Sequence, residues 1–335
     1  MPYLQVVMQD PLSAIDGFLR ASVNISQRDA KAARASRDWL LNQIHSFPQN
    51  EPDFPRLYSE RDIGFGSFAR KTKIQPLDDV DLVVGIHASG ASYIEDAHGC
   101  VRIAPVDGTW PAAYRDQTGY VSSTQIINRF AKSLRSVPQY STTGVGRRRE
   151  GVVVELSSYP WNFDIIPGFF TKPDMGNRTF YLIPDGNGAW QKTDPRRDRA
   201  RVQRINRLID GKALNAVRAI KYWQRRPTMP TISSYLVETM VLDYLESNHD
   251  QTDIDFLLAA VLSHMSTAVN GRVEDPKNIQ GDLNTLERET RSKVSARAHS
   301  DARLAIESVR QRLAGQHHSA INGWAEIFGK EFSRK

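Results

Sequence analysis

The change in hydrophobic pattern at Asp194-Pro195 is the feature that most limits the folds open to this chain. Before it, short apolar runs alternate with turn residues, which is typical of strands mixed with a few helices. After it, apolar residues recur every three to four positions, as in amphipathic helices. Asp194 is a good N-cap and Pro195 a good first helical residue. We therefore predict an α+β fold, with a mixed sheet and helices in residues 1–193 and helices only in residues 194–335.

Length and composition support this two-domain division. A chain of 335 residues is long for one compact domain. It has no apolar run of the ~18–20 residues that a membrane helix needs, and its N-terminus lacks the pattern of a signal peptide. The single cysteine, Cys100, excludes an intramolecular disulfide and a cysteine-rich zinc site. We expect a cytoplasmic monomer with no membrane partner.

Basic residues outnumber acidic ones, which favours anionic partners such as nucleotides or nucleic acid. Lysine and arginine total 44 against 38 acidic residues, giving a net charge of +6. One arginine cluster is Arg147-Arg148-Arg149, and another comprises Arg197, Arg201 and Arg204 on the helix after Pro195. The cluster on the helix could form an RNA-binding stripe or a solvated or salt-bridged helix surface, and we favour the surface.

The N-terminal domain is predicted to begin with a long packing helix at about residues 26–47, which Pro48 would end. Strands are expected at 80–87, 140–147, 152–157 and 162–170. Residues 88–120 are rich in turn formers and are long for a simple connection, although 93–94 and 101–103 could pair as a hairpin.

Two acidic residues stand at the start of the strand at 80–87. Aspartates two apart on a strand point to the same face, so Asp79 and Asp81 would project together while Val80 packs inward. Two adjacent carboxylates repel unless a cation lies between them, and oxygen-only ligands suit magnesium or manganese. An acidic strand start exposed to solvent is the alternative reading of so short a pattern.

A glycine-serine pair lies ahead of these acids. Gly66 would let the backbone approach a ligand closely, and the hydroxyl of Ser67 adds a donor. Together with the amides of a following helical turn, these groups suit a triphosphate.

Asp164 is a lone acid in the apolar strand at 162–170, where a charge is costly unless it is paired or binds metal. An ion pair with one of the arginines at 147–149 would satisfy it. A third carboxylate beside Asp79 and Asp81 is also what two-metal phosphoryl transfer requires, so both interpretations stay open.

Residues 66–72 (Gly-Ser-Phe-Ala-Arg-Lys-Thr) and 76–84 (Pro-Leu-Asp-Asp-Val-Asp-Leu-Val-Val) resemble the signature of the polymerase-beta-like nucleotidyltransferases. More closely, the chain resembles the bacterial cyclic-oligonucleotide synthases (CD-NTases) related to cyclic GMP-AMP synthase and oligoadenylate synthetase. The likeness covers most of the chain, because the second half also matches that family. The matching residues there are 217–223, 234–238, 274–276 with Asn278, and 324–329 with Phe332.

The resemblance implies a role for each residue of a site closed between two domains. Asp79, Asp81 and Asp164 would bind two Mg²⁺ ions, for which Mn²⁺ could substitute, and Gly66 with Ser67 would hold the donor triphosphate. The helical, oligoadenylate synthetase-like domain would add Lys221 and Ser234 as phosphate contacts and Tyr235 as a base-stacking residue. Without the resemblance, a solvated helix lysine and a core tyrosine would be the ordinary readings of Lys221 and Tyr235.

The implied activity joins ATP and other ribonucleoside triphosphates into a cyclic di- or trinucleotide, releasing pyrophosphate. Such a product would serve as a second messenger in anti-phage signalling, with a regulatory protein partner or an RNA as activator. A linear oligoadenylate synthetase-like or RNA-tailing enzyme is one alternative, and a non-catalytic binding scaffold is another. The chain lacks a cysteine-histidine zinc insertion, which argues against double-stranded DNA sensing.

Overall fold

The computed structural model describes residues 10–140, 144–250 and 253–332, and divides the chain into two compact units. The sheet unit comprises Gln27–Lys71 and Pro76–Arg199. The helical unit comprises Met1–Ser26, Thr72–Gln75 and Ala200–Lys335. The expected division at residue 193 is continuous in sequence, whereas these units are assembled from separate segments.

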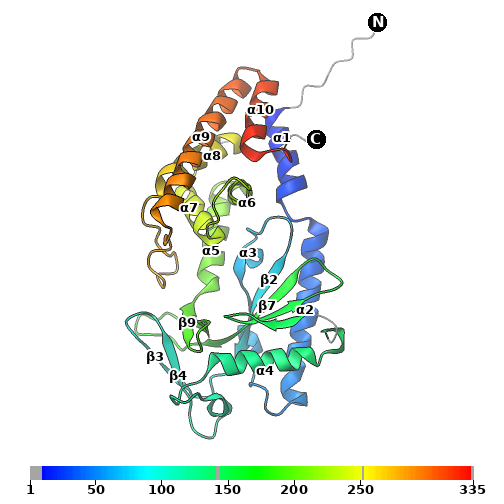
Figure 1. The fold of residues 1–335 in the computed structure, drawn as a ribbon, viewed down its shortest axis with the longest axis vertical. Helices are drawn as coiled ribbons and strands as arrows, with labels where there is room; N and C mark the ends of the chain where they lie inside the picture. The colour runs from blue at the N-terminus through cyan, green and yellow to red at the C-terminus, as the bar shows by residue number, and fades with distance from the viewer. Residues whose placement is uncertain (1–9, 141–143, 251–252, 333–335) are drawn as a thin grey trace. The chain divides into compact units, whose positions relative to one another are not determined.

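One mixed sheet forms the centre of the sheet unit (Figure 1). Its main path runs β1-β2-β7-β8-β9-β4-β3, and β6 pairs with both β5 and β7. Strands β2 and β7 pair in parallel, whereas the other strand pairs of the described residues are antiparallel. The strands of the described residues are β1 (Ile63–Gly64), β2 (Asp79–Ile86), β3 (Ser92–Glu95), β4 (Val101–Ala104), β5 (Val145–Arg147), β6 (Val152–Glu155), β7 (Asn162–Phe170), β8 (Tyr181–Pro184) and β9 (Trp190–Thr193).

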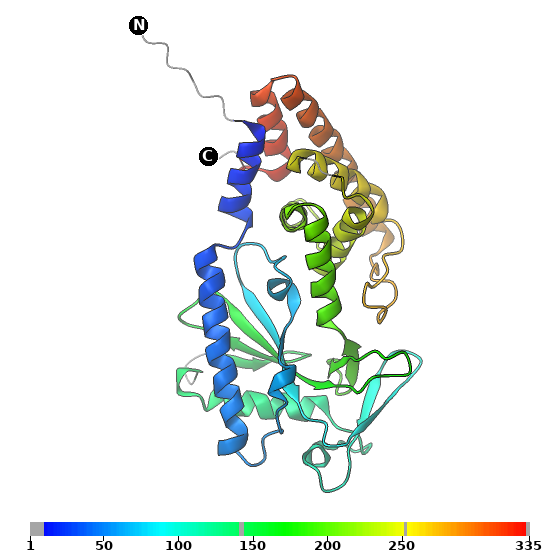
Figure 2. The ribbon, with the colours of Figure 1, turned by 180° about the vertical axis from the view of Figure 1, so that it is seen from behind.

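Helices α2 (Gln27–Asn50) and α4 (Ser123–Arg135) pack beside this sheet, as Figures 1 and 2 show. The long N-terminal helix is confirmed, but Pro48 does not end it; the helix runs on to Asn50 with Pro48 inside its last turn. The hydroxyl of Ser122 accepts the Gln125 amide at 3.4 Å and caps α4. The predicted hairpin within 88–120 is also confirmed, as β3 and β4.

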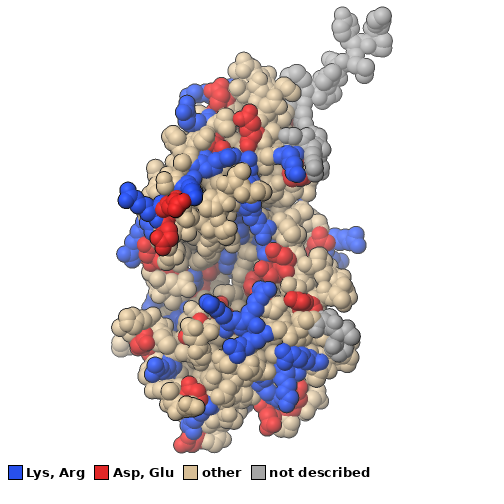
Figure 3. Space-filling model, viewed as in Figure 1, with Lys and Arg blue, Asp and Glu red and all other residues tan. Residues whose placement is uncertain are grey.

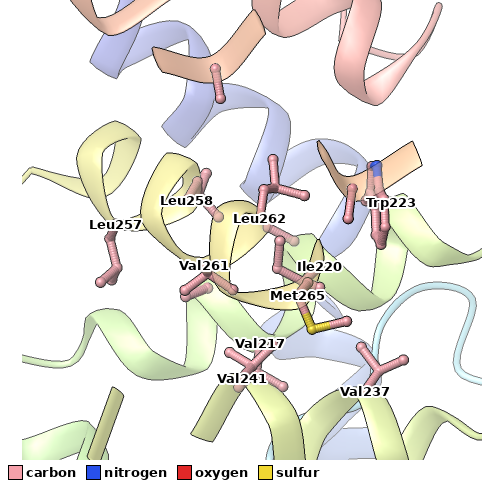
Figure 4. Close-up of a cluster of buried hydrophobic side chains, with 14 of the residues drawn as sticks. Val217, Ile220, Trp223, Val237, Val241, Leu257, Leu258, Val261, Leu262 and Met265 are labelled. Carbon is pink, nitrogen blue, oxygen red and sulfur yellow. The ribbon is translucent and has the colours of Figure 1, made fainter. Parts of the chain in front are cut away.

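The helical unit encloses a continuous hydrophobic core. Figure 4 shows part of it, where α6, α7 and α8 contribute facing apolar side chains such as Val217, Val241 and Leu262. No helix in the described residues is long and apolar enough to cross a membrane. The helices of this unit are α1 (Pro11–Phe18), the π-helical turn η1 (Leu19–Val23), α5 (Pro195–Leu208, which starts in the sheet unit), α6 (Lys212–Gln224), α7 (Ser234–Ser247), α8 (Ile254–Ala268), α9 (Arg288–Leu313) and α10 (His317–Phe328).

Candidate active site

The register of β2 and β7 brings the predicted acids together. The two strands are parallel, with Asp81 directly opposite Asp164 and Asp79 directly opposite Asn162. All of these residues are partly exposed, while Val80 between the acids is buried. Because alternate residues of a strand share a face, Asp79, Asp81 and Asp164 project from one face at the start of both strands.

The glycine-serine loop lies against Asp81. The Phe65 amide donates to the Asp81 carbonyl at 2.9 Å, and the chain then turns at Gly66 with φ of +65°. A Cβ placed on Gly66 would be 1.9 Å from Asp81 Oδ2, so glycine is required there. Ser67 follows in the single helical turn α3 (Gly66–Ala69). A residue that the sequence analysis missed supports this loop: Arg199 donates to the Gly64 carbonyl at 3.1 Å.

Asp164 also faces an arginine of the β5–β6 turn. Arg148 Nη1 lies 3.6 Å from Asp164 Oδ2, and the two side chains are 63% and 23% exposed. The ion pair between Asp164 and an arginine of 147–149, one of the two interpretations of the sequence, is therefore present. Asp164 is also the residue that stands opposite Asp81. A pocket of about 580 Å³ contains Asp81 and Asp164 together with Phe65 and the arginine turn. Figure 3 shows basic side chains gathered at the level of the sheet, with acidic ones beside them.

The donor chemistry of these acids fits a divalent cation. Three carboxylates on one face offer the oxygen ligands that Mg²⁺ and Mn²⁺ prefer. The absence of a Cβ on Gly66 lets this loop lie directly against the Asp81 carboxylate. In the part of the chain that the structure describes, however, no three His, Cys, Asp or Glu side chains form a closed ligand set. The register of β2 and β7 thus aligns the acids on one face of the sheet.

Lys221, predicted to contact phosphate, is buried within the helical unit. Its ammonium donates to the Thr72 carbonyl at 3.0 Å and lies 3.7 Å from Glu238 Oε2. The Thr72 hydroxyl donates to the same Glu238 oxygen at 2.7 Å. Lys221 and Glu238 are 6% and 1% exposed, so the solvated-lysine alternative is wrong. This network fixes Thr72–Gln75 within the helical unit, and the phosphate contact of Lys221 stays a prediction.

Ser234 and Tyr235 begin helix α7. Ser234 is exposed at the first helical position, while Ser233, which the sequence analysis missed, caps the helix by accepting the Leu236 amide at 3.4 Å. The hydroxyl of Tyr235 accepts a hydrogen bond from Lys277 Nζ at 2.6 Å, and the same ammonium lies 4.3 Å from the ring centroid. Tyr235 is partly exposed, so it is not a core residue.

Lys277 belongs to a turn organised by Asp275. The Asp275 carboxylate binds Lys277 Nζ at 2.9 Å and accepts the backbone amides of Lys277, Ile279 and Gln280. Burial raises the pKa of Asp275, but the Lys277 ammonium and the amides of Gln280 and Lys277 outweigh it, so the pKa lies below its usual value. The Asp-Pro-Lys sequence at 275–277 is a turn signal that could have directed attention to this lysine.

Two arginines of α5, Arg201 and Arg204, form ion pairs inside the helical unit. Arg201 binds Asp243 at 2.5 Å and Glu246 at 2.8 Å, and Arg204 also pairs with Glu246. The salt-bridged surface that we favoured for this cluster is therefore confirmed at Arg201 and Arg204.

Comparison with known proteins identifies this arrangement. No protein-family model matches the chain. It is 39% identical, over 96% of its length and 97% of the relative's, to a probable cyclic nucleotide synthase of Bacillus cereus (strain VD146). It is 23% identical, over 94% of its length and 95% of the relative's, to a cyclic AMP-AMP-AMP synthase of Escherichia coli (strain MS 115-1).

Solved structures give the same fold. Escherichia coli MS115-1 CdnC, in complex with HORMA-deltaN, superposes with a TM-score of 0.69 at 18% identity, covering 95% of this chain and 97% of that one. Escherichia coli DncV, in a 3′-deoxy GTP-bound form, superposes with a TM-score of 0.64 at 12% identity, covering 94% of each chain. The predicted polymerase-beta-like fold with a helical C-terminal region is thus confirmed.

The likeness to the Bacillus cereus relative makes this chain a nucleotidyltransferase, and its fold is the polymerase-beta-like fold of the CdnC and DncV structures. More specifically, the chain belongs to the cyclic nucleotide synthase (CD-NTase) family, because its likeness to the Bacillus cereus relative spans nearly both chains.

Proposed function

We propose that this protein is a metal-dependent nucleotidyltransferase that joins ribonucleoside triphosphates into a cyclic di- or trinucleotide and releases pyrophosphate. The observation that carries the proposal is the register of β2 and β7, which sets Asp81 opposite Asp164 with Asp79 on the same face. Nucleotide substrates are supported by the solved structures of Escherichia coli CdnC with ATP and of DncV with 3′-deoxy GTP.

In this proposal, Asp79, Asp81 and Asp164 hold two Mg²⁺ ions, or Mn²⁺. When bound, the ions would supply positive charge for the phosphates and favour ionisation of the attacking hydroxyl. Gly66 brings the backbone close to the donor triphosphate, and Ser67 adds a hydroxyl donor. Asp164 is suited to accept the proton of the attacking ribose hydroxyl, since it is a partly exposed carboxylate beside the other two.

The helical unit contributes Ser234, Tyr235 and Lys221 as proposed nucleotide contacts. Tyr235 presents a partly exposed ring whose hydroxyl Lys277 holds, which favours a fixed platform for base stacking. To contact a phosphate oxygen, the Lys221 ammonium would have to give up its hydrogen bond to the Thr72 carbonyl.

The cyclic product is proposed to act as a second messenger in anti-phage signalling, the role that the sequence resemblance implies. A regulatory protein partner is supported by the CdnC complex with HORMA-deltaN. The proposed product is a closed ring, which has no terminal phosphate.

Product analysis tests the proposal directly. The purified protein is incubated with all four ribonucleoside triphosphates, with and without Mg²⁺, and products are identified by mass spectrometry before and after phosphatase treatment. We expect pyrophosphate release only with metal and a product that phosphatase leaves intact. A phosphatase-sensitive product would indicate the linear alternative, and no product under any activating condition would indicate a scaffold.

A further inference from the structure

The long connection at residues 88–120 helps to form a second pocket of the sheet unit. Together with the end of α2 and the residues after it, this connection encloses about 530 Å³, a volume in the range of small-molecule sites. The lining residues all belong to the sheet unit: Pro48, Pro52, Phe54, Arg56, His87, Ser89, Thr109 and Trp110. The connection therefore builds a cavity wall as well as joining two elements.

This pocket lies at the carboxyl end of β2, whereas the proposed metal ligands lie at its start. His87 directly follows Ile86, the last residue of β2, and Asp79 is the first. The strand has 8 residues. At about 3.3 Å per residue, roughly 26 Å separates its two ends. The described lining shares no residue with the pocket that contains Asp81 and Asp164, so a ligand here leaves the reaction centre open.

Backbone hydrogen bonds hold His87 between two other lining residues. The His87 amide donates to the Arg56 carbonyl at 2.8 Å, and the His87 carbonyl accepts Trp110 Nε1 at 2.8 Å. An antiparallel bridge between Leu57 and Ile86 extends this pairing. The frame of the pocket is therefore built without using the Arg56 guanidinium or the His87 imidazole.

These two side chains keep hydrogen-bond donors for a ligand. His87 Nδ1 accepts the Ser89 amide at 3.1 Å, so the hydrogen of the neutral ring is on Nε2. Among the described residues, neither His87 Nε2 nor the Arg56 guanidinium has a hydrogen-bond or ion-pair partner. A guanidinium and an imidazole N–H at one pocket favour an anion, and a phosphate accepts from both.

The surroundings of the pocket leave this positive charge unopposed. None of the described lining residues is acidic. Two acids close to the lining in sequence are already paired, Glu51 with Arg129 at 2.8 Å and Asp107 with Arg115 at 2.5 Å. Asp53 is exposed and lies outside the lining. An anion that enters the pocket therefore meets a net positive site.

The remaining lining is largely apolar. Phe54 is 4% exposed, and Pro48 and Pro52 lie on either side of the chain turn that follows α2. Trp110 is partly exposed and is held against Phe169, with ring centroids 6.0 Å apart and planes 15° from parallel. Aromatic and proline surfaces of this kind suit a flat ring. A ligand that joins an anion to a flat ring would use both parts of the lining.

We propose that this pocket binds a nucleoside monophosphate, with its phosphate on Arg56 and His87 Nε2 and its base on the apolar wall. Neither half of the lining accounts for the pocket alone, because a simple anion needs no apolar wall and an apolar ligand needs no cation. The site is separate from the carboxylates of β2 and β7 and does not depend on the proposed reaction.

The test follows AMP binding at His87 itself. The Cε1–H resonance of His87 is assigned in a ¹H–¹³C NMR spectrum by its absence from H87Q, and the titration is made in EDTA so that no metal draws phosphate to the acids. We expect AMP to shift this resonance with a Kd of about 1 mM or tighter. R56Q should weaken binding about 10-fold, and R56K should recover only part, since lysine lacks the bidentate fork.

The control variant is R28Q, which removes an exposed arginine of the first turn of α2, outside the pocket. It should bind AMP like the parent. Equal Kd values for R56Q and R28Q would overturn the proposal, and so would the absence of a His87 shift in the parent at about 10 mM AMP.

Three further probes test the class of ligand. Adenosine lacks the phosphate and inorganic phosphate lacks the ring, so each should bind about 10-fold more weakly than AMP or worse. Inorganic phosphate that binds as tightly as AMP would reduce the pocket to a general anion site and overturn the proposal. Phenyl phosphate keeps a phosphate and a flat ring but lacks ribose, and its equal binding would overturn the nucleoside assignment.

The variant D79A/D81A separates this site from the reaction centre. It should show the same His87 shift and the same AMP affinity as the parent, because the two ends of β2 share no lining residue. Loss of the shift in D79A/D81A would overturn the proposal of a separate site. Because the titration needs no turnover, a parent protein that releases no pyrophosphate would contradict the proposed function and leave this inference standing.

Discussion

Gly66 and Asp81 are in such close contact that a single added methyl group would displace one of them. A Cβ on Gly66 would lie 1.9 Å from Asp81 Oδ2 and 2.6 Å from its Cγ. The contact joins the proposed phosphate loop to a proposed metal ligand, so the two cannot be altered independently.

We therefore predict that G66A reduces pyrophosphate release by about 100-fold or more, because a displacement of about 1 Å at reacting groups has effects of this size. Gly119 provides a matched control: its φ is +85°, like the +65° of Gly66, but a Cβ there meets nothing within 4 Å. G119A should carry a similar backbone strain of about 1–2 kcal/mol and keep full activity. Equal activity losses in both variants would show that strain, rather than the contact with Asp81, matters.

The double substitution D79A/D81A should abolish turnover while leaving the fold intact. Both side chains are partly exposed at the start of β2, so their removal opens no core cavity. Loss of charge stabilisation by bound cations should lower the rate by about 1,000-fold or more. Pyrophosphate release and circular dichroism measure the two effects. The control is D107A, which removes a carboxylate that is 89% exposed; retained turnover in D79A/D81A would remove the basis of the site assignment.

Lys221 is predicted to contribute to stability whether or not it reaches phosphate. K221A removes the ammonium from beside Glu238, a carboxylate that is 1% exposed, which should cost about 3 kcal/mol in the free energy of unfolding. Urea denaturation measures this, with K293A, on the exposed surface of α9, as control. The paired variant K221M/E238L should recover most of the loss. Unchanged stability in K221A would contradict the buried network.

Tyr140 gives a pH dependence of defined sign. Burial raises the pKa of its hydroxyl to about 12 from 10.0, and the residue is 4% exposed. Its protonated form is thus favoured by folding, so this contribution is complete below pH 10 and is lost as the pH rises through 12. Between these values the stability of the parent relative to Y140F should fall by about 3 kcal/mol at most. Urea titrations of both proteins at stepped pH measure it, and a pH-independent difference would refute the assignment.

The sequence by itself determined the parts of this protein that depend on local pattern. Asp79 and Asp81 could be placed on one face because a strand has a period of two, and Gly66 was expected to let the backbone approach a ligand closely. The long helix α2 and the β3–β4 hairpin followed from composition and spacing. The family resemblance rested on the same short motifs.

Only the tertiary structure decided which distant residues meet. From the sequence, Asp164 could equally be a third metal ligand or an ion-pair partner. In the structure, the register of β2 and β7 places it opposite Asp81, and it also lies 3.6 Å from Arg148. The burial of Lys221 with Glu238 and Thr72 was not foreseen, because the helical period shows which face is polar but not that a polar residue is paired inside. Register and pairing depend on contacts between segments far apart in the chain, and those contacts are properties of the packed fold rather than of any local stretch.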